Sequence, residues 1–139
     1  MVPVMLRTFA GTRRVAHPPA ERPILIFDGA CEFCQRWARR WRARAGDHFD
    51  IEPARTAAGR FPEIAGAEFE RAVQFIDTDG QVFTGAEAVL RARARTASRS
   101  RLLAAYERLP GAASAAEAVY RLVARHRSLL SWLMRLLRP

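Results

Sequence analysis

The sequence lacks several features that would place it in a particular class of protein. It contains no lysine, so all 23 of its Lys/Arg residues are arginine. No apolar run approaches the length of about 18 residues that a transmembrane helix needs. The apolar start, Met1–Ala10, is interrupted by Arg7 and is too short for the core of a signal peptide. We therefore expect a cytoplasmic protein, and its 139 residues fit one domain.

Cysteine is also scarce, with Cys31 and Cys34 as the only two in the chain. A lone pair cannot build a framework of several disulfides, and it supplies only half of a four-ligand zinc site. In a chain without an export signal, a Cys-x-x-Cys pattern is typical of redox chemistry. Two readings stay open beside it, a pair of buried structural cysteines and half of a zinc site shared across a dimer. We expect no metal and no cofactor.

The charge is unevenly distributed. The 23 Arg stand against 14 acidic residues, and residues 86–138 hold eleven Arg against only three acids. Such a surface suits an acidic protein, a nucleic acid or an anionic membrane, although a solvated helical surface is the simpler explanation. We do not expect nucleic-acid binding, because the basic residues are not interleaved with aromatics in a recognisable module.

The pattern of the first half predicts a strand followed by a helix. Ile24–Phe27 is a continuous apolar run, as a strand buried on both faces requires. From Cys31 the apolar residues recur at helical spacing, and Gly46 is a suitable end for that helix. Phe49–Ile51 predicts a short second strand, and residues 54–69 predict a short helix or two turns.

The middle of the chain predicts a hairpin. Ala72–Ile76 and Gln81–Phe83 read as strands, and Asp77–Gly80 between them carries an Asp-Gly turn signal. Thr84–Glu87 matches a capping box, which predicts a helix over residues 85–95.

The last third predicts further helices. One spans Ser100–Leu109, and a second capping box at Ser114–Glu117 opens a long helix that extends to about Leu137. The resulting order, β-α-β-(α)-β-β-α with added C-terminal helices, predicts an α/β thioredoxin-like three-layer fold. We expect residues 1–21 to form a disordered or loosely ordered arm, and 22–139 to form the domain with a helical extension over about 100–137.

The Cys-x-x-Cys pattern lies at the predicted start of the first helix. The unpaired N–H groups and partial positive charge there favour a thiolate, and Cys31 at the tip gains most. Cys34, one turn further in on the apolar face, should be more buried. We therefore predict that Cys31 attacks a protein or low-molecular-weight thiol/disulfide substrate and that Cys34 resolves the mixed disulfide.

Other residues are candidates for supporting this site. Asp28 is three residues before Cys31, where it could exchange a proton with Cys34, hold the loop, or simply serve as a turn residue. Gly29 permits a tight turn or a close approach. Phe33 and Trp37 are the nearest aromatics, and Trp37 either packs in the core or borders the site.

These residues resemble the DCC family of thiol-disulfide oxidoreductases, which is named for its Asp-x-x-Cys-x-x-Cys pattern. The resemblance implies a thioredoxin-like fold, a dithiol redox activity and a site at Asp28, Cys31 and Cys34. Thioredoxins also place a cis-proline before the hairpin, whereas Glu70 and Arg71 occupy that region here, so the wall that binds substrate should be absent or rebuilt. The resemblance covers residues 22–128 and rests on Phe27–Cys34 with Trp37, Asp77–Gly80, Gly85–Leu90 and Val119–Arg127.

A second function is compatible with the sequence, a non-catalytic thioredoxin-like interaction module that binds a protein partner or an anionic membrane surface through its basic C-terminal helices. Ser128–Leu137 is strongly apolar and ends near Arg135 and Arg138. This segment could pack on the domain, which is the default expectation, form a dimer seam, or lie on a membrane surface. We expect a monomer or weak homodimer, with peripheral membrane contact as the alternative role of this segment.

Overall fold

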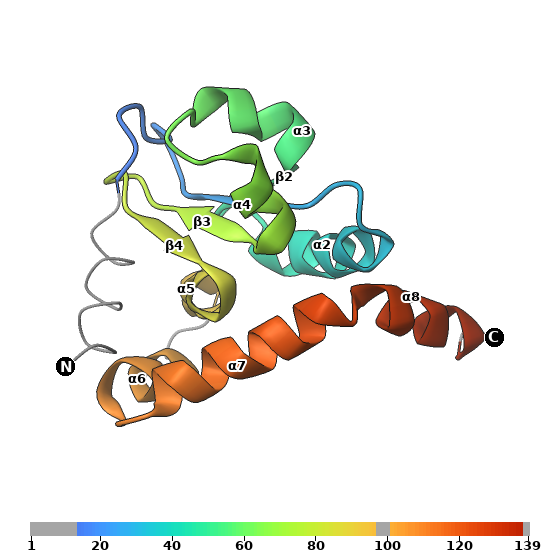
Figure 1. The fold of residues 1–139 in the computed structure, drawn as a ribbon. Coiled ribbons are helices and arrows are strands. Elements are labelled where there is room, and N and C mark those ends of the chain that lie inside the picture. Colours follow the sequence, from blue (N-terminus) through green and yellow to red (C-terminus); the bar gives the residue numbers. More distant parts are fainter. Residues whose placement is uncertain (1–13, 97–100, 138–139) are drawn as a thin grey trace.

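The computed structural model describes residues 14–96 and 101–137 and shows a mixed sheet packed between helices (Figure 1). The elements in chain order are β1 (Ile24–Phe27), α2 (Glu32–Ala45), β2 (Asp50–Pro53), α3 (Ala54–Ala57), the short 3-10 helix η1 (Ala58–Arg60), α4 (Gly66–Arg71), β3 (Gln74–Ile76), β4 (Val82–Thr84), α5 (Gly85–Thr96), α6 (Arg101–Arg108), α7 (Ala112–Arg125) and α8 (Arg127–Leu136).

The described sheet has four strands in the order β2-β1-β3-β4. β1 pairs with β2 in parallel, and β3 pairs antiparallel with both β1 and β4. Helices α2 and α5 pack on one face of this sheet, and α3 and α4 lie on the other (Figure 1). This layered β-α-β unit followed by a hairpin and a helix is a thioredoxin-like α/β arrangement, which confirms the predicted fold class.

The two faces of β1 build two separate cores. Successive side chains of a strand point to opposite faces, and all four residues of β1 are at most 5% exposed. Leu25 and Phe27 pack with Trp41 of α2 on one side. Ile24 and Ile26 pack on the other side with apolar residues of the α3–α4 region. Because both faces of β1 are buried, the end of this strand is a rigid base for the loop that follows it.

Helix α2 begins and ends close to the predicted residues. Cys31 is its N-cap, with an extended backbone, and Gly46 with φ 50° is its C-cap. Trp37 and Trp41 lie one turn apart, and their ring centroids are 5.2 Å apart. The ring centroids of Trp41 and Phe49 are 6.4 Å apart. This cluster of tilted aromatic rings anchors the helix on the sheet.

The hairpin is confirmed, and it also binds part of the N-terminal region. Its turn contains Gly80 with φ 92°, in the left-handed region that glycine tolerates best. The N–H of Val15 donates to the Gly80 carbonyl at 2.9 Å, and the Val15 side chain is only 7% exposed. Residues 14–21 of the expected arm thus include a buried anchor, while residues 1–13 lie outside the described residues.

The capping box expected at the start of α5 is wrong. The N–H groups of Ala86 and Glu87 donate to the carboxylate of Glu117 on α7, at 3.0 and 3.3 Å. The Glu87 carboxylate binds Arg91 one turn further along α5, and the Thr84 hydroxyl accepts a hydrogen bond from Gln74. The carboxylate of a residue on another helix therefore caps the start of α5 in place of the local motif.

The prediction of a single long C-terminal helix is also wrong, both in where the helix begins and in its continuity. Helix α7 begins two residues before Ser114, after an N-cap at Gly111, and the Glu117 carboxylate binds α5 and does not cap its own helix. The helical run then breaks at His126, and α8 follows. No proline or glycine lies at this break.

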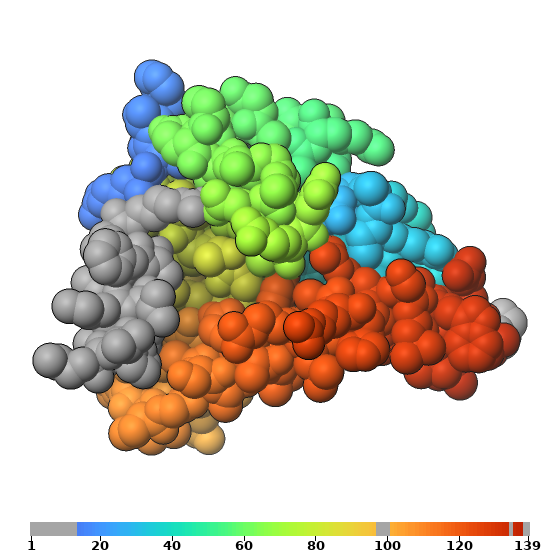
Figure 2. All heavy atoms as spheres, in the orientation of Figure 1, coloured from blue at the N-terminus to red at the C-terminus, as the bar shows by residue number. Residues whose placement is uncertain are grey.

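Helix α8 buries only one side of the apolar segment Ser128–Leu137. It lies against α2, with Ser131 buried and Arg135 paired with Glu32 at 3.7 Å. Figure 2 shows α7 and α8, in orange and red, along one side of the molecular surface. No helix in the described part of the chain is both long and apolar enough to cross a membrane. The apolar side chains that α8 leaves exposed are Leu129, Trp132, Leu133, Leu136, and the following Leu137.

Candidate active site

The two cysteines share the first turn of α2. Cys31 is the N-cap of the helix, and its Sγ accepts a hydrogen bond from the Cys34 N–H at 3.3 Å. Both residues are partly buried and neither is in a disulfide. Among residues 14–96 and 101–137, no group of three or more His, Cys, Asp or Glu side chains is placed to share a metal ion. The spacing thus brings both thiols to the positive end of one helix.

The loop before Cys31 is held by its own hydrogen bonds. The Asp28 Oδ1 accepts from the Ala30 N–H at 3.1 Å, and the Cys31 N–H donates to the Asp28 carbonyl at 3.3 Å. The Gln35 side chain donates to the Gly29 carbonyl from the next turn of α2. A Cβ on Gly29 would lie 2.8 Å from the Pro53 Cβ at the end of β2. Gly29 is therefore explained by the close approach of a neighbouring strand.

The inner thiol, Cys34, is in a poorly hydrated environment. Burial, followed by the neighbouring Cys31 sulfur, raises the pKa of the Cys34 thiol to about 12, and the Arg127 guanidinium opposes this rise. Cys34 also packs against the aliphatic and aromatic core between α2 and the sheet. At neutral pH the Cys34 thiol is thus protonated, and the positive charge nearest to it comes from another helix.

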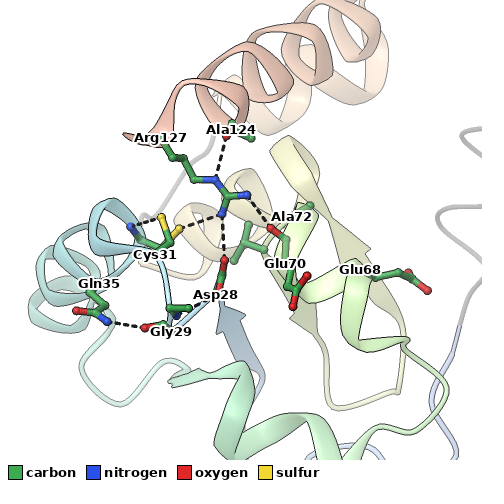
Figure 3. Close-up of polar contacts among 12 residues, drawn as sticks. Asp28, Gly29, Cys31, Gln35, Glu68, Glu70, Ala72, Ala124 and Arg127 are labelled. Atoms are coloured by element: carbon green, nitrogen blue, oxygen red, sulfur yellow. Dashed lines mark hydrogen bonds and ion pairs between the residues drawn. The ribbon is translucent and has the colours of Figure 1, made fainter. Parts of the chain in front are cut away.

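Arg127, the first residue of α8, connects four parts of the site (Figure 3). Its Nη1 donates to the Cys34 Sγ at 3.2 Å and lies 3.7 Å from the Asp28 Oδ2. Its Nη2 donates to the Glu70 carbonyl at 2.6 Å, and its Nε donates to the Ala124 carbonyl at 3.0 Å. The guanidinium group therefore links the inner cysteine of the Cys-x-x-Cys pair to the aspartate of the preceding loop.

Side chains from α7 and α8 also cover the backbone before β3, where thioredoxins have their cis-proline. No peptide bond in the described ranges is cis. The Glu70 carbonyl accepts a hydrogen bond from Arg127, and the Val73 N–H donates to the Tyr120 hydroxyl at 2.8 Å. The wall opposite the cysteines is thus rebuilt from C-terminal helices.

Two pockets flank the cysteines, and Arg127 lines both. The first, which we call the apolar pocket, has a volume of about 440 Å³ and includes Cys34 and Phe33. The second, which we call the arginine pocket, has a volume of about 420 Å³ and includes Cys31. The apolar pocket lies between α2, α5 and α7 and is lined mainly by Phe27, Phe33, Trp37, Val89, Leu90, Val119, Tyr120 and Val123. The arginine pocket is lined by Ala30, Cys31, Glu32, Ala124, Arg125, Arg127, Ser128, Ser131 and Arg135.

Comparison with known proteins assigns the family. Residues 25–133 match the family described as DCC1-like thiol-disulfide oxidoreductase, a match that covers most of the chain and both cysteines. The chain belongs to this family. No curated protein and no solved structure matches it.

Within this DCC1-like domain, the structure brings together most of the residues that the sequence singled out. Cys34 and Asp28 meet at the Arg127 guanidinium, and Cys31 lies beside Cys34 on the same helical turn. Phe33 and Trp37 line the pocket beside Cys34. Gly29 lies in the same loop, where it contacts β2 and no space for a ligand remains at its Cα. The geometry thus gathers the candidates, while their catalytic roles stay predictions.

The sequence did not single out Arg127 or the Tyr120 hydroxyl. The arginines of α2 that are nearer in sequence lie elsewhere: Arg36 pairs with Glu32 at 3.3 Å, and Arg39 and Arg40 are exposed. The only sequence signal for Arg127 is its place at the end of the matching segment Val119–Arg127. Its position 93 residues after Cys34 gives no local pattern by which it could be recognised.

Proposed function

We propose that this DCC1-like domain is a thiol-disulfide oxidoreductase in which Cys31 and Cys34 cycle between dithiol and disulfide. One observation carries the proposal: two thiols lie on one helical turn, the outer one at the N-cap and the inner one desolvated beside Arg127. The outer sulfur accepts the Cys34 N–H hydrogen bond at the start of α2, and it is the attacking sulfur in the proposal. The inner sulfur stays protonated until the mixed disulfide has formed.

The chemistry takes place in two exchanges. The Cys31 thiolate attacks one sulfur of the substrate disulfide, forms a mixed disulfide with it and releases the other sulfur as a thiolate. Cys34 then gives up its proton and attacks the Cys31 sulfur, which releases the second substrate thiolate. The protein loses two electrons as one internal S–S bond forms, and the substrate gains them as its own S–S bond is broken.

Arg127 and Asp28 act on the second exchange. As Cys34 loses its proton, the guanidinium at 3.2 Å stabilises the developing thiolate. Asp28, held 3.7 Å from the same Nη1, is the nearest carboxylate on that guanidinium and serves as the proton acceptor in the proposal. The expected cytoplasmic location stays a prediction; in such a compartment the dithiol would be the resting form.

The test is a redox titration of the purified protein with detection of free thiols by mass. A single reversible two-electron couple that is lost in Cys31→Ser supports the proposal. The Cys34→Ser variant should accumulate mixed disulfides on Cys31, whereas Cys31→Ser should trap none. If the wild-type thiols show no reversible couple anywhere in the biological range of potentials, the redox proposal is wrong.

A second candidate function is favoured by the exposed apolar side of α8, formed by Leu129, Trp132, Leu133, Leu136 and Leu137. These side chains are between 42% and 73% exposed. Residues 118–137 contain four arginines and no acidic residue. Arg127 and Arg135 pair with Asp28 and Glu32, but the segment keeps a net positive charge. An apolar surface beside net positive charge is complementary to an anionic lipid bilayer, where such a helix lies in the interface. As a second proposal, α8 attaches the domain to an anionic membrane.

Vesicle co-sedimentation tests the membrane proposal. Vesicles that contain phosphatidylglycerol should bind the protein at low salt, and neutral phosphatidylcholine vesicles should bind it weakly. Trp132→Ser should reduce this binding, while Leu102→Ser, at an equally exposed apolar position on α6, should leave it unchanged. Absence of binding at low salt excludes this function. A Cys31→Ser/Cys34→Ser protein that retains its cellular role would favour attachment over redox chemistry as the main function.

A further inference from the structure

The arginine pocket is a candidate binding site that the proposed redox chemistry does not explain. It is about 420 Å³, within the range of about 300–1,000 Å³ that small-molecule sites occupy. Cys31, the proposed attacking residue, is in its wall, and the opposite wall comes from the end of α7 and the start of α8. Whatever reacts with Cys31 from this side must contact these helices.

The pocket is positively charged. Its lining contains three arginines, Arg125, Arg127 and Arg135, and one acidic residue, Glu32. Glu32 pairs with Arg135 at 3.7 Å, and Arg127 pairs with Asp28 behind the pocket. Within the described residues, Arg125 has no carboxylate within 4.0 Å. The pocket therefore keeps positive charge that the protein itself does not neutralise.

Helix ends add to this charge. α2 begins at Glu32, next to Cys31, and α8 begins at Arg127, with Ser128 in its first turn at the pocket wall. The N-terminus of a helix carries partial positive charge and unpaired N–H groups that bind anions. The N-terminus of α2 and the arginine side chains thus lie beside the same small volume as Cys31.

We propose that the arginine pocket binds the carboxylates of a low-molecular-weight disulfide and so sets the substrate class of the enzyme. The inference rests on the proposed function, since it names the molecule that Cys31 attacks. Arg125 and Arg135 hold the carboxylates, and the disulfide of the same molecule lies against Cys31. Reaction with the Cys31 thiolate releases one substrate thiolate, and attack by Cys34 on Cys31 releases the second. Each turnover converts the protein dithiol to a disulfide and one substrate disulfide to two thiols.

The proposal is tested with two disulfides that differ in charge. Glutathione disulfide carries carboxylates, and hydroxyethyl disulfide carries no charge. In single-turnover reactions of the reduced protein, we expect Arg125→Gln and Arg135→Gln each to lower the second-order rate constant for glutathione disulfide about twofold to fivefold, since each removes one solvent-exposed charge. Hydroxyethyl disulfide should be turned over at an unchanged rate. Arg93→Gln, at an exposed arginine on α5, is the matched control and should leave the rate with both disulfides unchanged.

Two further measurements separate charge from structure. Arg125→Lys should restore most of the rate with glutathione disulfide, because it keeps the charge. The unreactive analogue S-methylglutathione should raise the Tm of the wild-type protein, and this rise should shrink in the Arg125→Gln/Arg135→Gln double variant and at high salt.

The outcomes distinguish this inference from the proposed function. If the arginine variants slow both disulfides equally, or neither, and S-methylglutathione gives no Tm shift, the arginine pocket does not select carboxylates, while turnover of hydroxyethyl disulfide still supports the redox function. If the wild type reduces neither disulfide and shows no reversible thiol couple, both proposals fail.

Discussion

The guanidinium of Arg127 donates a hydrogen bond to the sulfur of Cys34 across a separation of 93 residues in the chain. The contact places a permanent positive charge beside a thiol whose pKa burial raises to about 12. Burial disfavours the ionised form of Cys34, whereas the positive charge of Arg127 favours it. We expect this opposition to govern how fast the proposed mixed disulfide is resolved.

Replacing Arg127 tests this relationship. Arg127→Gln should raise the Cys34 pKa further and slow resolution by about tenfold or more, because a charged hydrogen bond to the developing thiolate contributes about 1.5–3 kcal/mol. Stopped-flow mass detection of the mixed disulfide should show it accumulating while the first exchange keeps its rate. Arg121→Gln, at an exposed arginine on α7, should behave like wild type. An unchanged resolution rate in Arg127→Gln would mean that the guanidinium has only a structural role.

The raised pKa of Cys34 predicts a pH dependence. The folded state favours the protonated thiol, so the stabilising contribution of Cys34 is full below the pKa of about 8.5 of an unfolded thiol and is lost as the pH rises toward 12. In a Cys31→Ser variant, the rate of Cys34 alkylation should therefore still be rising at pH 10. A plateau below pH 9 would show that the thiol is not desolvated as the structure indicates.

Gly29 has no room for a side chain. Gly29→Ala would bring its Cβ to 2.8 Å from the Pro53 Cβ, so we expect a loss of about 1–3 kcal/mol in the free energy of unfolding and a displaced Asp28 loop. Chemical denaturation measures the loss. Gly59→Ala, in the short helix η1 with nothing within 4 Å of its Cβ, is the matched control and should be close to neutral. Equal stabilities for the two variants would contradict the close contact with β2.

Glu117 joins three helices and should be important for stability. Its carboxylate accepts from the N–H groups of Ala86 and Glu87 and from the Tyr106 hydroxyl at 2.6 Å. Glu117→Ala should destabilise the fold by about 2–4 kcal/mol, because it removes the acceptor of two helix N–H groups and one hydrogen bond of the Tyr106 hydroxyl. Tyr106→Phe removes one of these bonds and should cost about 1 kcal/mol. A Glu117→Ala protein with wild-type stability would show that water replaces the carboxylate without penalty.

The local pattern of residues was sufficient to predict much of this fold. The run Ile24–Phe27, the helix from Cys31 to Gly46 and the hairpin around Gly80 are confirmed because each depends on neighbours within one strand, turn or helix. The capping boxes failed for the opposite reason. Thr84 and Ser114 match the local motif, but the Glu117 carboxylate binds the start of α5 in the folded chain.

The sequence by itself determined that two thiols share the first turn of a helix after a buried strand, because helical spacing and strand burial are properties of consecutive residues. Only the tertiary structure decided which of the 23 arginines faces Cys34. That choice depends on where α8 packs against α2 and on the break at His126, where Arg127 turns toward Cys34, Asp28 and the Glu70 carbonyl. Such bonds join residues far apart in the chain, and no local periodicity encodes them.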